Sequence, residues 1–247
     1  MSCPNKQPVR HQEYFLPGGD LYLQVDNVLF RIHKFFFERD SAHFRTLLDS
    51  PVAPNTTRSG SSETKPIAIR NSSPSEFAKF LFIFYNPKYS DYTDFDTADW
   101  TCVLKIACEH EFVEVQHCAI RALQDCDLST VERIHVYKLY KVDPKYLVPL
   151  YIAMAVRDEG PTDKEVHHLG AETSLLIFRL REYLRSRNGF GGKSPLPPDV
   201  SDDDALRAVC HFLQVDVSQM QSLVSTSNFK GKKSPCPKGG KRGQGNY

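Results

Sequence analysis

Apolar residues occupy every second position in two short segments near the start of the chain, residues 21–25 and 28–32. A period of two is typical of half-buried β-strands, so this pattern predicts two strands. The Asp-Asn pair that separates them tolerates the left-handed backbone of a tight turn, which predicts a β-hairpin. Over residues 33–48 the apolar positions recur three or four apart, and this spacing predicts a helix directly after the hairpin.

The same two periods predict one more strand and a series of helices. Residues 67–69 are expected to form the strand, after a surface loop at residues 50–66 that is rich in Pro, Ser, Thr and Gly. Asp99 is expected to cap the helix that follows it, and residues 163–187 are expected to form one continuous helix. The predicted helical segments are residues 75–85, 100–107, 113–123, 131–139, 144–156, 163–187 and 201–213.

Changes in composition divide the chain into five parts. Residues 1–15 are expected to form a flexible N-terminal arm, and residues 16–127 carry the predicted strands and the first helices. Residues 128–187 form a helical extension, and residues 188–200 form a linker rich in Gly and Pro. Residues 201–247 combine a short helix with a disordered basic tail. The expected fold class is α/β (α+β), a small β-sheet surrounded by α-helices.

Composition indicates a folded body with a basic end. Hydrophobic residues make up 40% of the 247 residues, and 16 Phe and 11 Tyr are enough for a sizeable aromatic core. The formal net charge is only +1, because the tail offsets a mildly acidic remainder. We expect the tail to be a solvated, disordered end, with a nuclear-import or nucleic-acid patch as the alternative. Its positive residues are Lys230, Lys232, Lys233, Lys238, Lys241 and Arg242.

Cysteine usage and hydropathy indicate an intracellular protein, nuclear or cytoplasmic. The seven cysteines are odd in number and scattered, which does not fit a disulfide framework. The N-terminus lacks the apolar core of a secretory signal, and no apolar window approaches the roughly 20 residues that span a bilayer. We therefore expect reduced thiols and no membrane partner.

The sequence contains no complete catalytic or cofactor motif. Cys108, His110, His117 and Cys118 have a spacing that matches none of the usual zinc patterns, and they lie on predicted core helices. Residues 192–194 read GKS, but the glycine that a phosphate-binding loop needs five positions earlier is missing. A G-x-S-x-G nucleophile elbow is also missing. The sequence therefore predicts a protein that is not an enzyme and that uses no metal or cofactor.

Short motifs along residues 16–187 together resemble the BTB/POZ family. The hairpin and the helix after it contain D-L-Y-L-x-V, F-x-x-H-K and S-x-x-F, which are similar to the signature of that family. The order that the family requires continues with I-A-I, S-E-F-A-K-F-L-F-I-F-Y-N, W-T-C-V-L-K-I-A-C-E-H-E-F and V-Q-H-C-A-I-R-A-L. The later segments resemble the helical extension of the expanded fungal branch, through E-R-I-H-V-Y-K-L-Y-K-V and D-K-E-V-H-H-L-G-A-E-T. By this resemblance residues 16–127 are the BTB/POZ domain.

The resemblance implies a non-enzymatic protein–protein interaction module, a homodimer that recruits other proteins. In dimers of this family an aspartate and a basic residue form a charged pocket near the interface, and the matching residues here are Asp20 and Lys34. Alternatively, Asp20 only starts a strand and Lys34 is a solvated helix residue. The other residues of the expected interface are Leu21, Tyr14, Phe15 and Leu16. The last three either add an exchanged strand across the dimer or pack on their own chain.

Two other functions stay open. Some BTB proteins are adaptors of cullin-type ubiquitin ligases, and these carry a hydrophobic-x-Glu element after the helix that here ends near Leu48. Residues 47–52 read LLDSPV and lack this Glu, so a cullin partner is not favoured. The second alternative is a nuclear or chromatin-associated regulator that uses the basic tail, although the acidic remainder does not favour a nucleic-acid partner.

Overall fold

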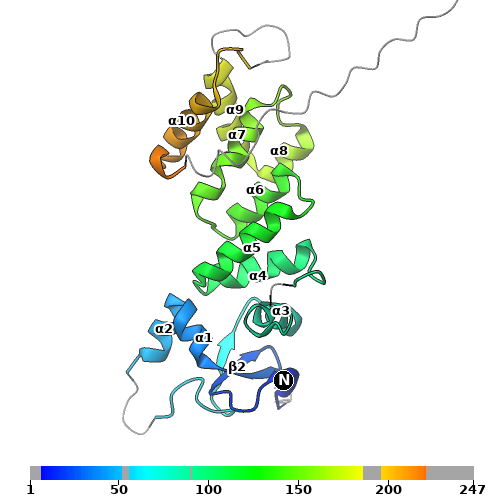
Figure 1. The fold of residues 1–247 in the computed structure, drawn as a ribbon, viewed down its shortest axis with the longest axis vertical. Coiled ribbons are helices and arrows are strands. Elements are labelled where there is room, and N and C mark those ends of the chain that lie inside the picture. Colours follow the sequence, from blue (N-terminus) through cyan, green and yellow to red (C-terminus); the bar gives the residue numbers. More distant parts are fainter. Residues whose placement is uncertain (1–6, 52–55, 90, 186–195, 221–247) are drawn as a thin grey trace, which may run out of the picture. The chain divides into compact units, whose positions relative to one another are not determined.

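The computed structural model describes residues 7–51, 56–89, 91–185 and 196–220 (Figure 1). The contacts divide the chain into two compact units, Met1–Val142 and Asp143–Tyr247. In the described residues the first unit combines a small sheet with helices, and the second contains helices. The mixed α/β class predicted from the sequence is therefore confirmed. The predicted boundary between residues 127 and 128 lies inside the first unit.

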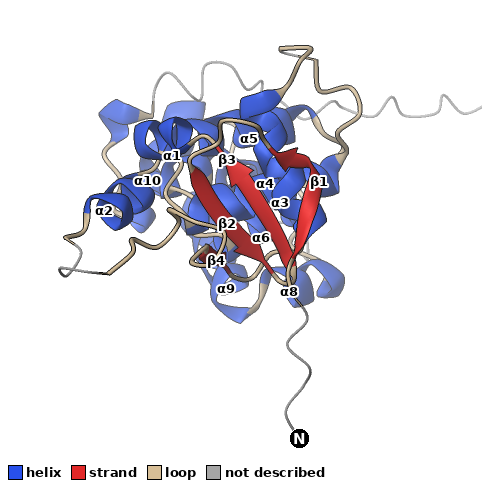
Figure 2. Cartoon of the chain, turned by 90° about the horizontal axis from the view of Figure 1, so that it is seen from below, coloured by secondary structure: helices blue, strands red, loops and turns tan. Residues whose placement is uncertain are grey.

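The first unit contains a four-stranded sheet with the strand order β1-β3-β2-β4 (Figure 2). The strands are β1 (Val9–Phe15), β2 (Leu21–Val25), β3 (Val28–Ile32) and β4 (Ile67–Ile69). Strands β2 and β3 form the predicted antiparallel hairpin, and Asp26 adopts a positive φ of 49° in its turn. Because β1 runs parallel to β3 and β4 runs parallel to β2, the sheet is mixed.

Strand β1 corrects the expectation of a flexible N-terminal arm for residues 9–15, and residues 1–6 of that predicted arm lie outside the described residues. Val9–Phe15 pairs with β3 of the same chain, with a shift of register between Arg10 and Phe15. Most side chains of β1 are exposed or half-exposed, so its sequence lacks the alternating apolar pattern that identifies a strand. Tyr14 is the buried exception, and its ring lies 5.9 Å from the ring of Tyr85.

The described part of the first unit contains the helices α1 (Lys34–Asp40), α2 (Ala42–Asp49), α3 (Pro74–Tyr85), α4 (Thr97–Glu109), α5 (Val113–Asp125) and α6 (Thr130–Leu139). The continuous helix predicted over residues 33–48 is wrong, because Ser41 is extended and separates α1 from α2. Ser41 forms an isolated antiparallel bridge with Phe112. The prediction of Asp99 as a cap is also wrong. Asp96 is the N-cap residue of α4, and Asp99, three residues later, completes the capping box by accepting the backbone N–H of Asp96.

Aromatic rings fill the core between the sheet and the helices of the first unit. Phe30 on β3 meets Phe77 on α3 edge to face, with ring centres 5.1 Å apart. The ring centres of Phe37, Phe80 and Phe112 lie between 5.0 and 6.4 Å from one another, and each of these side chains is 0% exposed. Such pairs add about 0.5–1.5 kcal/mol each to what burial alone contributes. The predicted aromatic core is therefore confirmed in the first unit.

The described part of the second unit contains α7 (Val148–Val156), α8 (Asp163–Leu169), α9 (Ala171–Arg185), α10 (Asp202–Leu213) and the short 3-10 helices η1 (Pro144–Tyr146) and η2 (Val217–Gln219). Gly170 interrupts the helix predicted over residues 163–187, because its φ of 77° lies in the left-handed region. Helix α10 lies within the segment predicted to be helical at residues 201–213, begins after its cap Ser201, and packs against α7 and α9. It therefore belongs to this helical unit. No helix in the described ranges has the length and apolar content that a membrane crossing requires.

Candidate functional site

Asp20 and Lys34 meet where the hairpin leads into α1, through one side chain and one backbone group. The carboxylate of Asp20 accepts the backbone N–H of Lys34, the first residue of α1, at 2.8 Å. The N-cap residue His33 makes no capping hydrogen bond with its own side chain, so Asp20 supplies the acceptor from the neighbouring segment. The ammonium group of Lys34 pairs with Glu38 one turn further along the helix, at 3.0 Å. Asp20 and Lys34 are both exposed, and Asp20 acts as a cap of α1.

We expect Asp20→Ala to lower the free energy of unfolding by about 1 kcal/mol, because the first amide of α1 loses its acceptor. Asp20→Asn should retain most of the stability, since an amide oxygen also accepts. Lys34→Ala should cost less than about 0.5 kcal/mol, because the Lys34–Glu38 pair is solvent-exposed. Urea unfolding followed by the fluorescence of the single tryptophan, Trp100, measures these differences. Equal costs for the two alanine variants would contradict the capping role of Asp20.

Two residues of the expected dimer interface are buried in the chain itself. Tyr14 is 3% exposed and Leu21 is 1% exposed, so neither side chain is available to a partner in this arrangement. Phe15 and Leu16 are half-buried, and the guanidinium of Arg10 lies 4.6 Å from the centre of the Phe15 ring. In this single chain, β1 pairs with β3 of the same chain, and an exchange of residues 14–16 across a dimer stays a prediction.

Phe35 of α1 is an exposed aromatic residue that the sequence analysis did not select. Its side chain is 60% exposed, and the guanidinium of Arg39 lies over the ring, 5.3 Å from its centre. Lys34 and Glu38 pair on the same helix. We call Lys34, Phe35, Glu38 and Arg39 the α1 surface. It combines an exposed ring with side chains of both charges.

A sequence signal for Phe35 existed. Residues 35–37 are three consecutive phenylalanines, and successive side chains of an α-helix point about 100° apart, so three cannot face one core. Phe37 is 0% exposed, and Phe36 contacts Phe84 and Tyr85 with ring centres 5.5 and 5.4 Å apart. The ring left over is that of Phe35. The pattern indicated that one ring would be exposed, but only the packing identifies which one.

Cys108 and Cys118, the two cysteines of the unusual zinc spacing, are half-buried on α4 and α5. No group of three or more His, Cys, Asp or Glu in the described ranges is placed to hold a metal ion. Burial raises the pKa of the Cys108 thiol to about 11 and also raises the pKa of Cys118. Both thiols are therefore protonated at neutral pH, and a protonated thiol is a poor nucleophile and a poor metal ligand.

A surface hollow of about 480 Å³ in the first unit is lined by polar residues, several of which pair with one another or with a neighbour. Asn71 donates a hydrogen bond to Glu109 at 2.8 Å, and Lys105 pairs with Glu76 at 3.0 Å. The thiol of Cys108 also lines the hollow, and its raised pKa keeps it protonated. These contacts pair Asn71 with Glu109 and Lys105 with Glu76, and they do not place a nucleophile beside a base.

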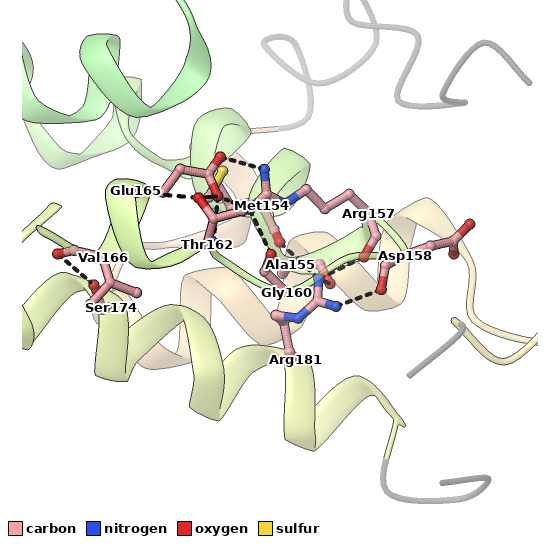
Figure 3. Close-up of polar contacts among 10 residues, drawn as sticks. All are labelled: Met154, Ala155, Arg157, Asp158, Gly160, Thr162, Glu165, Val166, Ser174 and Arg181. Carbon is pink, nitrogen blue, oxygen red and sulfur yellow. Dashed lines mark hydrogen bonds and ion pairs between the residues drawn. The ribbon is translucent and has the colours of Figure 1, made fainter. Parts of the chain in front are cut away.

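A dense polar cluster lies at the C-terminal end of α7 in the second unit (Figure 3). The guanidinium of Arg181, on α9, donates to the backbone carbonyls of Met154, Ala155, Arg157 and Asp158 at distances from 2.6 to 3.3 Å. The last carbonyls of a helix have no partner within the helix, so Arg181 satisfies groups that α7 leaves open. Burial, together with neighbouring guanidinium groups, lowers the pKa of Arg181 to about 10, and the side chain stays charged at neutral pH.

Arg157 joins α8 to the same cluster. Its guanidinium makes two hydrogen bonds to the carboxylate of Glu165, at 2.8 and 2.6 Å, and Glu165 also accepts the N–H of Thr162 at 2.7 Å. The hydrogen bond from Arg157 lowers the pKa of Glu165 to about 2. The stabilisation from this carboxylate is therefore present above its ordinary pKa of 4.5 and is lost as the pH falls toward 2. The cluster is a structural junction between α7, α8 and α9.

The positive residues of the predicted tail lie outside the described residues, and they are Lys230, Lys232, Lys233, Lys238, Lys241 and Arg242. A nuclear-import or nucleic-acid role for the tail therefore stays a prediction. The BTB/POZ resemblance rests on its sequence motifs and stays a prediction. No protein-family model matches the chain, and no curated protein sequence matches it either.

Proposed function

We propose that the protein is a non-enzymatic interaction module that forms a homodimer through the α1 surface and recruits other proteins. The observation that carries this proposal is the 60% exposure of Phe35 beside charges of both signs. An aromatic ring surrounded by polar side chains is typical of the centre of a protein–protein interface. The resemblance to BTB/POZ proteins supports the same region, because in their dimers the positions that match Asp20 and Lys34 lie near the interface.

The charges of the α1 surface are complementary to those of the same surface on a second copy of the chain. Most homodimers have two-fold symmetry, so the same patch of both chains meets across the axis. Lys34 and Glu38 lie one turn apart on one helix. When two copies of α1 cross in opposite directions, the lysine of each copy faces the glutamate of the other, and the two Phe35 rings meet between these pairs. Opposite charges in such positions set the register of the interface more than its affinity.

Asp20 has an indirect role in this proposal. Its carboxylate holds the first amide of α1 at 2.8 Å, which fixes the start of the helix relative to the hairpin. A helix that is already fixed loses less conformational entropy when it binds. Asp20 therefore orients the α1 surface and does not itself contact the second copy. This assignment differs from the charged pocket that the family resemblance implies.

We expect Phe35→Lys to weaken dimerisation by about a hundredfold or more, because the dimer would lose two aromatic rings that its interface buries, each of which contributes about 1.5–3 kcal/mol. The measurement is size-exclusion chromatography with light scattering on the full chain, at concentrations from one to one hundred micromolar. The wild-type chain should approach twice the 28.1 kDa mass of one copy. The variant should stay near the mass of one copy over the same range.

The matched control is Leu139→Lys. Leu139 is 58% exposed and is the last residue of α6, where a positive charge is favourable to the helix. This variant should dimerise like the wild type. A wild-type chain that is monomeric at tens of micromolar would contradict the proposal, and so would an equal loss of dimer in both variants.

A further inference from the structure

His110, the C-cap residue directly after α4, is a buried histidine whose ring has no hydrogen-bond partner among the described residues. Its side chain is 8% exposed, and both ring nitrogens are inaccessible to solvent and unpaired. A neutral imidazole has one donor and one acceptor, whereas the protonated ring has two donors and a full charge. A buried position without an acceptor therefore tolerates the neutral ring far better than the charged one.

Most of the groups around the ring of His110 also favour its neutral form. The ring centre of His43, on α2, lies 5.4 Å away, and a proton on one of two neighbouring imidazoles opposes a proton on the other. Phe44 of α2 contributes an uncharged ring at 5.4 Å. Glu109, on α4 itself, favours protonation, but burial outweighs it, and the pKa of His110 is lowered.

The backbone of His110 joins two parts of the first unit. Its carbonyl accepts the hydroxyl of Ser41 at 2.6 Å. The same Ser41 oxygen accepts the N–H of Phe44 at 2.9 Å and so caps α2. Ser41 also forms the isolated bridge with Phe112, the residue before α5. His110 therefore connects two places in the first unit. Through its carbonyl it holds Ser41, which separates α1 from α2, against the turn between α4 and α5.

We propose that this junction is a pH-sensitive latch, which is closed while His110 is neutral and opens when His110 takes up a proton from solvent. Opening gives the charged ring access to water and separates it from His43. It also breaks the hydrogen bond from Ser41 to the His110 carbonyl, so the cap of α2 loses its anchor. The latch depends on contacts within the first unit and does not rest on the proposed dimer.

The direction of the pH dependence follows from the two forms of the junction. In the open form the ring has an ordinary pKa of about 6.5, and in the closed form burial holds the pKa lower. Well above pH 6.5 neither form is protonated, so opening does not depend on pH. Below pH 6.5 only the open form binds the proton, and the equilibrium constant for opening rises by up to about tenfold per pH unit. The rise ends once the closed form is also protonated.

The test is amide hydrogen exchange on the full chain from about pH 5 to 8, corrected for the intrinsic dependence of exchange on pH. The Phe44 amide, which donates to Ser41, and the Phe112 amide, which donates to Ala107, report the opening. We expect their opening constants to be flat above pH 7 and to rise by up to about tenfold per pH unit below pH 6.5. His110→Phe keeps a ring but cannot take the proton, so it should remove this rise.

Two further measurements keep the test decisive. His43→Gln removes the opposing charge and should reduce the rise, whereas His167→Gln, an exposed histidine of the second unit, should leave it unchanged. An NMR titration of the His110 ring in the wild-type chain, which does not depend on the folding of any variant, should show a midpoint below pH 6.5. A midpoint at or above 6.5, or opening constants that do not change with pH, would overturn the latch.

Discussion

Replacing Phe37 by alanine is expected to lower the free energy of unfolding of the first unit by about 3–5 kcal/mol, one of the two largest effects that we predict. The ring is 0% exposed. It lies 4.7 Å from the ring of Phe44, 6.4 Å from Phe80, 6.0 Å from Phe84 and 5.1 Å from Phe112. These four rings come from α2, from α3 and from the residue before α5, so they cannot all close on the space that an alanine leaves, and the cavity adds to the loss of buried area.

The control for this variant is Phe35→Ala, two residues earlier on the same helix. Phe35 is 60% exposed, so its removal should cost less than about 1 kcal/mol. Urea unfolding followed by the fluorescence of Trp100, which is 6% exposed in α4, reports on the first unit. The aromatic core would not be the main source of stability there if Phe37→Ala cost no more than Phe35→Ala.

The hairpin and most helices of the first unit followed from local patterns, because each has one apolar face that the sequence shows directly. The two breaks that the patterns missed have different causes. Gly170 needs a positive φ, and a glycine inside a helical pattern is a local signal of that possibility. Ser41 is extended because it pairs with Phe112, about seventy residues away, and no local pattern contains that contact.

The capping residues show how far local signals extend. Asp96 and Asp99 both lie where a helix begins, and a capping box uses an acceptor at both positions, so composition alone does not distinguish the cap from its partner. Asp20 caps α1 from 14 positions earlier in the chain. The sequence motif pairs Asp20 with Lys34, and the two residues are in contact. The contact joins the carboxylate of Asp20 to the backbone N–H of Lys34, which the charges of the two side chains do not indicate.

The exposure of the residues expected at a dimer interface could not be predicted from the sequence, because burial depends on distant contacts. Tyr14 and Leu21 are apolar or aromatic residues beside the hairpin, and they were expected at a dimer surface. Both are buried, since β1 lies along β3 and the ring of Tyr14 packs near Tyr85 of α3. The exposed ring of Phe35 replaces them as the centre of the candidate surface.

Replacing Arg181 by methionine is expected to destabilise the second unit by about 3 kcal/mol or more, because several buried carbonyls would lose their donor. Arg181 is 6% exposed, and its guanidinium donates to the carbonyls of Met154, Arg157 and Asp158 at 3.1, 2.6 and 2.9 Å. Arg181→Lys should recover part of the loss, since an ammonium group also donates but lacks the planar fork that reaches several carbonyls together. Native-state hydrogen exchange in α7 and α9 measures the change.

Arg179→Met is the matched control, because Arg179 lies on the same helix, two residues away, and is exposed. It removes the same charge and the same length of side chain, so it should change exchange in α7 and α9 little. If both methionine variants had the same effect, net charge and not the contacts with α7 would explain the loss. If neither did, the Arg185 guanidinium, which donates to the carbonyl of Arg157 at 2.8 Å, would be sufficient to hold the end of α7. A large effect of Arg181→Met alone identifies this buried cation as the group that closes the C-terminus of α7, which explains why a helical unit keeps a charge in its interior.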